Sequence, residues 1–206
     1  VTTLSSRLSL REPADRAARS AALARTVVAR LPRDGAIRVL DLGSGTGSNI
    51  RYLAPLLPPC QRWLAVDRDR ALLSEVPALI GGASLDCSIE TGNHDLGSAP
   101  VELFTGRHLG TASALLDLVS EAWLQVLAER CRAAGAAALF ALTYNGQSRC
   151  DPPEPEDERI RERLNRHQRQ NDKGFGRAAG PEAVACAAGA FAAVGYRVEL
   201  EGTDWQ

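Results

Sequence analysis

The seven residues 41–47, Asp-Leu-Gly-Ser-Gly-Thr-Gly, constrain the fold more than any other part of the chain. They overlap the end of a short apolar stretch, residues 37–42, which has the length and composition of a buried strand. Glycines after a strand let the backbone turn tightly and leave its N–H groups open to a ligand near the next helix. The segment therefore predicts a strand, loop and helix that bind a nucleotide-like or anionic ligand, although an ordinary tight turn is the alternative.

The spacing of the glycines argues against two other kinds of ligand-binding loop. The dinucleotide-binding pattern G-x-G-x-x-G would place glycine at position 48, where the chain has Ser48. A P-loop would require Gly-Lys-Ser or Gly-Lys-Thr, which these residues do not provide. Both alternatives fit the loop poorly.

Strands and helices are expected to alternate along the chain. The apolar patterns predict strands at 37–42, 63–67, 85–91, 109–115, 136–144 and 196–200, and helices at 13–31, 49–57, 69–76, 118–131 and 181–194. Such alternation is typical of an α/β fold with a mainly parallel sheet and helices on both faces. A chain of 206 residues suits one domain of this kind, spanning 1–206.

Two segments stand outside this alternation. Residues 145–180 contain an acidic, proline-rich run, an Arg-rich stretch and Gly174-Phe-Gly176, and together they are too long for an ordinary connection. They are predicted to form a lid or a substrate-recognition insertion. Residues 1–35 are predicted to form an N-terminal helical cap.

The run from Val39 to Gly47, with a second acidic strand end at Asp67, resembles the first motifs of the class I S-adenosylmethionine-dependent methyltransferases of the small bacterial type. The resemblance implies a Rossmann-like sheet of six or seven strands, S-adenosylmethionine as cofactor and S-adenosylhomocysteine as product. Only six strands can be placed, because six residues follow position 200. Either the chain is shortened at its C-terminus or the sheet is one strand short.

The resemblance also implies a set of cofactor-binding residues. Asp41 would hold the cofactor's amino group, and Asp67 would accept both ribose hydroxyls. Asp95 would receive the adenine amino group beside the backbone N–H of Leu96, although residues 93–98 also suit a plain turn. The full implied set is Asp41, Gly43, Ser44, Gly45, Gly47, Asp67, Arg68, Asp95, Leu96 and Ser113.

Catalytic groups are harder to identify, because methyl transfer from a sulfonium needs a base only when the acceptor carries a proton. Tyr144, at the end of a predicted strand, could orient or deprotonate the acceptor, or simply pack. His167 could act as a base, or lie on a solvated helix face. Asp117 could face the acceptor, or cap the helix expected from 118. Arg11 is a candidate substrate contact, with surface charge as the alternative.

The composition limits the expected binding partners and the expected cellular location of the protein. A net charge of −1 gives no general attraction to nucleic acid or membranes. Five widely spaced cysteines form no zinc-binding pattern, so we expect reduced thiols and no metal. No apolar run of membrane-spanning length and no secretory signal is visible, which predicts a cytoplasmic protein. The excess of arginine over lysine suggests a GC-rich bacterial genome.

Transfer to a small-molecule acceptor is the leading hypothesis from the sequence. An RNA methyltransferase is an alternative, because seven basic residues lie between 159 and 177 and could bind a carboxylate, a phosphate or an RNA backbone. A non-catalytic protein that keeps the fold for binding S-adenosylmethionine and a nucleotide-dependent oxidoreductase are the alternatives from other classes. No oligomeric state is predicted.

Overall fold

The computed structural model describes residues 3–81, 87–98, 100–170 and 172–205. They belong to two compact units. The first unit comprises Val1–Ser113, Arg130–Leu142 and Glu199–Gln206, and the second comprises Ala114–Glu129 and Thr143–Val198. The first two residues of the strand expected at 85–91 lie outside the described residues.

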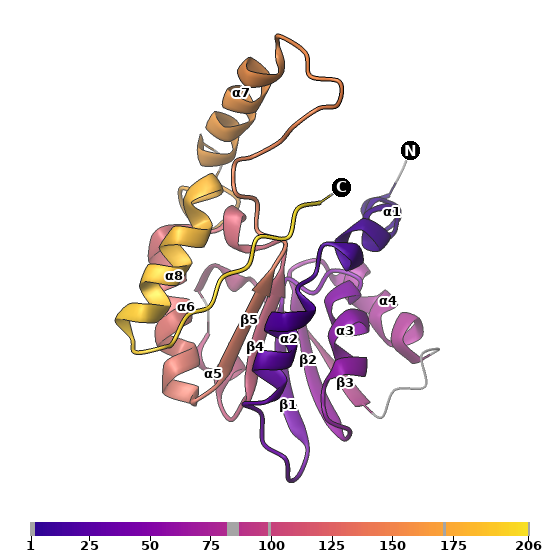
Figure 1. Cartoon of the computed structure of the whole chain (residues 1–206). Coiled ribbons are helices and arrows are strands. Elements are labelled where there is room, and N and C mark those ends of the chain that lie inside the picture. The colour runs from indigo at the N-terminus through magenta and orange to yellow at the C-terminus, as the bar shows by residue number, and fades with distance from the viewer. Residues whose placement is uncertain (1–2, 82–86, 99, 171, 206) are drawn as a thin grey trace. The chain divides into compact units, whose positions relative to one another are not determined.

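A parallel sheet in the order β3-β2-β1-β4-β5 forms the centre of the first unit (Figure 1). The strands are β1 (Ile37–Leu42), β2 (Gln61–Asp67), β3 (Cys87–Asn93), β4 (Leu109–Ser113) and β5 (Ala137–Ala141). Every neighbouring pair is parallel, so all carboxyl ends lie at the same edge. The α/β class and the parallel sheet predicted from the alternation are confirmed.

The expected count of six or seven strands is wrong, because the described residues form a sheet of five. Residues 196–200 were expected to be a strand, yet the structure gives them no strand assignment. Val198 and Leu200 remain 37% and 65% exposed. The residues that follow are held by side chains instead: Glu201 accepts a hydrogen bond from Ser20, and Thr203 Oγ1 donates to the carbonyl of Ala18.

Three helices cover one face of the sheet, namely α2 (Ala21–Val28), α3 (Ser48–Leu53) and α4 (Arg70–Gly81). Figure 1 shows α2 and α3 in front of the strands. Their apolar side chains share one core cluster with β1, β2 and β4, which includes Ile50, Trp63 and Val76. The 3-10 turns η1 (Ala54–Leu56) and η2 (Leu96–Ser98) and the short α5 (Val101–Phe104) complete the connections.

The single helix expected at 13–31 is two helices, α1 (Leu4–Ala17) and α2. Pro13, expected to open the helix, lies inside α1. Ser20 causes the break, because its side chain accepts a 2.9 Å hydrogen bond from the N–H of Leu23. In a continuous helix that N–H would bond to the carbonyl of residue 19, so Ser20 acts as the N-cap of α2.

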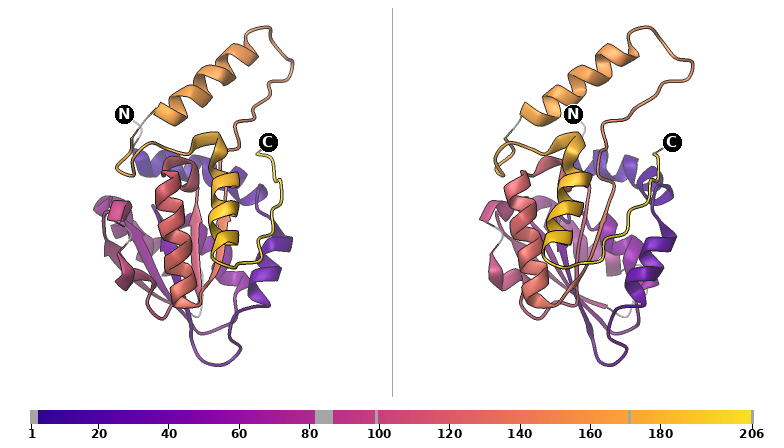
Figure 2. Two further views of the ribbon diagram at one scale, coloured as in Figure 1. Left: turned by 90° about the vertical axis from the view of Figure 1, so that its left-hand side faces the viewer. Right: turned by 60° about the vertical axis from the view of Figure 1, so that its left-hand side comes forward.

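The second unit contains η3 (Leu116–Leu118), the start of α6 (Glu121–Ala134), α7 (Asp157–Gln170), η4 (Gly180–Glu182) and α8 (Ala183–Ala193). Helix α7 projects beyond α8 in both views of Figure 2, and none of its described residues is buried. After α7, Asp172 Oδ1 accepts backbone hydrogen bonds from Gly174, Phe175 and Gly176 at 2.8–3.1 Å. No helix among the described residues is both long and apolar enough to cross a membrane.

Substitution of Gly47 tests the left-handed backbone on which the loop between β1 and α3 depends. Gly47 has a φ of +82°, and an added Cβ would lie 3.2 Å from Ile80 and 3.3 Å from Val76. We expect Gly47→Ala to lower the free energy of unfolding by roughly 1–3 kcal/mol, measured by urea denaturation. The matched control is Gly81→Ala, because no described atom lies within 4 Å of its added Cβ. Equal losses in the two variants would contradict the prediction.

Candidate functional site

The glycine loop between β1 and α3 is held to both central strands by Ser44. Its Oγ donates to the carbonyl of Asp41 at 2.8 Å and accepts from the N–H of Val66 at 3.1 Å. The backbone N–H of Ser44 also donates to the carbonyl of Val66 at 3.0 Å. Gly43, Gly45 and Gly47 all have positive φ angles. The loop is therefore a defined turn at the carboxyl ends of β1 and β2.

Asp41 is fully buried at the end of β1. Its Oδ1 accepts a 2.6 Å hydrogen bond from Asn49 Nδ2, whereas Oδ2 has no hydrogen-bond partner in the described part of the chain. Burial raises the pKa of Asp41 to about 6, against the opposing effects of hydrogen bonds from Asn49 and Ser44 and of the positive charge of Arg19. A buried acceptor without a donor is unusual and indicates a position where a ligand donor would be stabilised.

Asn49 connects Asp41 to two further elements. Its Nδ2 also lies 3.1 Å from Thr111 Oγ1 on β4, and Thr111 in turn donates to the carbonyl of Leu139 on β5 at 2.7 Å. Its Oδ1 accepts a 2.6 Å hydrogen bond from Arg19 Nη1. Arg19 Nη2 donates to Ser113 Oγ at the end of β4, at 3.0 Å. From the sequence, Arg19 was only one of several charged residues around the N-terminal helix that could cover the site, with surface charge as the alternative, because nothing local distinguishes it from the other arginines nearby.

This network lies at the point where the strand order of the sheet reverses. β1 is paired with both β2 and β4, and Asp41 is in register with Ala65 on one side and Thr111 on the other. In open α/β sheets, ligands bind outside the carboxyl ends of the strands at such a reversal. The structure thus brings Asp41, the glycine loop and Ser113 to one edge of the first unit.

Asp67 lies beside the loop at the end of β2. Its Oδ2 accepts a 2.8 Å hydrogen bond from the N–H of Gly45, and its Oδ1 accepts one at 2.9 Å from the N–H of Asp69. The next residue, Arg68, is exposed, and its carbonyl accepts from Asn93 Nδ2 at 2.9 Å. Asp67 therefore lies close to the loop as expected, with its carboxylate bonded to backbone N–H groups.

Asp95 and Leu96 follow β3. Asp95 is exposed, and its Oδ1 accepts a 3.0 Å hydrogen bond from the N–H of Gly97, which closes a turn within the same segment. Leu96 is buried. This geometry is that of the plain turn considered from the sequence, and an adenine contact at Asp95 stays a prediction.

Helix α1 lies over the glycine loop. Leu8 Cδ1 is 3.2 Å from the position of a Cβ on Gly45, and Ser5 donates to Glu75 of α4 at 2.7 Å. Arg51 bonds to Glu12 of α1 through two nitrogens and donates from Nη1 to the carbonyl of Thr46. These contacts attach α1 to the loop and to its flanking helices. Arg11, the candidate substrate contact, is paired with Asp15 one turn further along α1.

The three catalytic candidates lie in the second unit. Tyr144 donates a 2.8 Å hydrogen bond to Asn165 Oδ1 of α7, and burial raises its pKa, which disfavours deprotonation. His167 is exposed on α7, and Asp117 is buried in η3. Asp117 does not cap a helix at 118, because α6 begins at Glu121 and Ser120 Oγ accepts from the N–H of Trp123. Their catalytic roles stay predictions.

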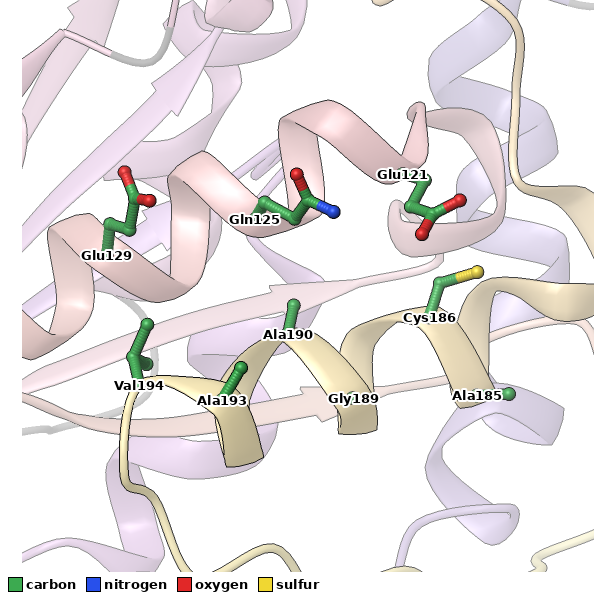
Figure 3. A pocket seen from close by; sticks show the side chains of 9 residues that line it. All are labelled: Glu121, Gln125, Glu129, Ala185, Cys186, Gly189, Ala190, Ala193 and Val194. Carbon is green, nitrogen blue, oxygen red and sulfur yellow. The ribbon is translucent and has the colours of Figure 1, made fainter.

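A cavity of about 560 Å³ lies in the second unit between α6 and α8 (Figure 3). Small side chains of α8 form one wall, and Glu121, Gln125 and Glu129 of α6 line the other. None of the residues expected to form the site lines this cavity. The described residues also contain no cluster of His, Cys, Asp and Glu that could hold a metal ion.

The sequence matches no family model and no curated protein. Solved structures nevertheless resemble it in fold. An O-methyltransferase family protein from Burkholderia thailandensis, 15% identical, has a TM-score of 0.60, with 94% of this chain and 53% of that one covered. The cyclopropane synthase MmaA2 from Mycobacterium tuberculosis, 9% identical, has a TM-score of 0.57, with 85% and 60% covered.

A third similar structure is a mycolic acid cyclopropane synthase solved with SAH and CTAB. It is 10% identical, with a TM-score of 0.56 and with 86% of this chain and 60% of that one covered. The chain spans between 53% and 60% of the length of these three proteins. At such low sequence identities the similarity establishes the architecture of the chain but not the reaction. The chain has the fold of the class I S-adenosylmethionine-dependent methyltransferases.

Proposed function

We propose that the protein binds S-adenosylmethionine at the glycine loop and transfers its methyl group to a small-molecule acceptor. The observation that carries the proposal is the buried Oδ2 of Asp41, which has no donor within the described residues and lies beneath the loop where the strand order reverses. The fold, shared with methyltransferases and cyclopropane synthases, supports the same reading.

The residues of the loop fit the amino-acid part of this cofactor. An ammonium group would supply the donor that Asp41 Oδ2 lacks, and it would offset the cost of a buried negative charge. Gly43, Gly45 and Gly47 have positive φ angles, a left-handed backbone conformation that residues with a Cβ atom rarely adopt. When bound, the cofactor supplies a methyl group already activated by a sulfonium, so that the protein's main task is to orient and desolvate the two reactants.

Asp67 is the residue that we expect to hold the ribose of the cofactor. Each of its carboxylate oxygens accepts one backbone hydrogen bond and retains a second lone pair for a hydroxyl donor. The bond from Gly45 keeps the carboxylate next to the glycine loop. Asp95, Leu96 and Arg68 would then lie toward the adenine side, and Ser113 toward the sulfonium.

A small-molecule acceptor is favoured over RNA. The net charge of −1 offers no general attraction to phosphate backbones. Among the described residues between 159 and 177, Arg161 is already paired with Glu158 and Arg169 with Glu182, so part of the basic charge is compensated within the chain. Residues 145–180 would cover or recognise the acceptor, with Tyr144, His167 and Asp117 as candidate catalytic groups and Arg11 as a candidate contact. We place the reaction in the bacterial cytoplasm.

The raised pKa of Asp41 predicts a pH-dependent affinity for the cofactor product. Burial raises this pKa to about 6 in the free protein, and an adjacent ammonium would favour the ionised form and lower it. The affinity for S-adenosylhomocysteine, measured by calorimetry, should therefore increase as the pH rises through about 6, by up to about tenfold per pH unit, and then level off. A flat profile in this range would contradict the role of Asp41.

Two isosteric variants test the binding of the amino-acid part and of the ribose of the ligand separately. Asp41→Asn should weaken S-adenosylhomocysteine binding roughly ten- to hundredfold, because a charged hydrogen bond is lost. It should leave methylthioadenosine binding unchanged, since that molecule lacks the amino-acid part. Asp67→Asn should weaken both ligands by similar factors, because both contain the ribose.

Calorimetric titration of the two variants and the unaltered protein checks this pattern, with thermal melting as the control for folding. The same titration includes NAD. Selective binding of NAD, or equal losses for both ligands in Asp41→Asn, would refute the assignment of the loop to S-adenosylmethionine. Transfer of a labelled methyl group to a small-molecule fraction of a cell extract, and not to its RNA, tests the acceptor class.

A further inference from the structure

Three arginines of this chain pair with carboxylates through the same edge of the guanidinium. Arg11 uses Nε and Nη2 toward Asp15, and Arg51 uses the same two nitrogens toward Glu12. Arg169 uses them toward Glu182. This side-on fork matches the two oxygens of a carboxylate and is among the strongest hydrogen-bonded arrangements in proteins.

The same edge of Arg19 meets no carboxylate in the described part of the chain. Its Nη2 donates to the neutral hydroxyl of Ser113, and its Nε is buried without a hydrogen-bond partner. The guanidinium is nevertheless held in place, because Nη1 donates to Asn49 Oδ1 and Cζ lies 4.9 Å from the centroid of the Tyr52 ring. Arg19 is thus a positioned cation whose fork lacks an anionic partner.

Partial burial of the Arg19 side chain, with its Nε fully buried, makes this arrangement costly. Desolvation lowers the pKa of Arg19, and the carboxylates of Asp41 and Asp15 oppose that effect without forming an ion pair with it among the described residues. A buried charge is expensive unless a hydrogen-bonded counter-charge compensates it. A purely structural link from the segment before α2 to β4 would need only a neutral donor, so a charged side chain at this position points to an anionic ligand.

A second atom without a partner lies in the same network. Asp41 Oδ2 lacks a donor, as Arg19 Nε lacks an acceptor, and both residues bond to the single amide of Asn49. One side of the network therefore suits an ammonium and the other a carboxylate. In an α-amino acid these two groups share one carbon atom, as the cation of Arg19 and the anion of Asp41 share the amide of Asn49.

We propose that Arg19 binds the α-carboxylate of the methionine part of S-adenosylmethionine through its Nε and Nη2 edge, while Asp41 binds the ammonium. This inference rests on the proposed function. Arg19 would then be the residue that discriminates ligands with an α-carboxylate from ligands without one. The link between α1 and α2 would contact the ligand directly.

Titration with three ligands tests the inference without measuring turnover. They are S-adenosylhomocysteine, its decarboxylated analogue, which keeps the amine, and methylthioadenosine, which lacks both groups. In Arg19→Gln we expect S-adenosylhomocysteine to bind roughly ten- to hundredfold more weakly, because a charge-assisted fork is lost. The affinities of the decarboxylated analogue and of methylthioadenosine should not change.

Arg16→Gln is the matched control, because Arg16 also lies over the Tyr52 ring, at 5.9 Å. Unlike Arg19 it is exposed, and among the described residues it forms no hydrogen bond with Asn49 or Ser113. The Arg16→Gln variant should leave all three affinities unchanged.

If thermal melting shows that Arg19→Gln does not fold, Arg19→Lys replaces it, because lysine keeps the charge and lacks the fork. In that variant the preference for S-adenosylhomocysteine over its decarboxylated analogue should be smaller than in the unaltered protein.

The outcomes separate the two hypotheses. If the unaltered protein binds none of the three ligands, the proposed function fails and the inference fails with it. If the unaltered protein binds S-adenosylhomocysteine but the Arg19 variant weakens it and the decarboxylated analogue equally, the proposed function stands and the role of Arg19 is refuted. An unchanged affinity for S-adenosylhomocysteine in the Arg19 variant would refute it in the same way.

Discussion

The hydrogen bond between the buried carboxylate of Asp41 and the amide of Asn49 is the interaction on which the rest of the site depends. It joins the end of β1 to the first turn of α3, and the same amide reaches Thr111 on β4 and Arg19 before α2. Three elements and the link before α2 therefore meet through one side chain. Since an unsatisfied buried polar group costs free energy, each of these bonds limits where its element can lie.

The charge of Asp41 opposes folding. Its pKa is about 6 in the folded protein and 3.8 is its ordinary value, so the folded state holds the proton more tightly than the unfolded chain. The resulting cost begins above 3.8 and is complete above about 6, and it amounts to roughly 3 kcal/mol. Such a cost is typical of residues kept for binding, where a cationic ligand group offsets it. Arg19 has a similar desolvation cost, in its case for a positive charge.

Local sequence patterns predicted those structural elements whose conformation depends only on residues close together in the chain. The strand at 37–42, the turn formed by the glycines and the parallel sheet followed from apolar runs and glycine spacing, and these are confirmed. The break before α2 was missed because a single serine, Ser20, competes for a backbone N–H inside an otherwise helical pattern. The strand expected at 196–200 was wrong because its pattern says nothing of a pairing partner, and Glu201 and Thr203 are bound elsewhere.

By itself the sequence determined the class of fold and the kind of loop, because backbone turning and the burial of apolar strands depend mainly on neighbouring residues. Asp41 and Asp67 were identifiable as candidate site residues, since each lies at the end of a recognisable strand. Only the tertiary structure decided that Arg19 turns toward Asn49 and Ser113, 30 and 94 positions away in the chain. A side chain's charge can be read from a sequence, whereas the partner that compensates it is set by which distant elements the fold brings together.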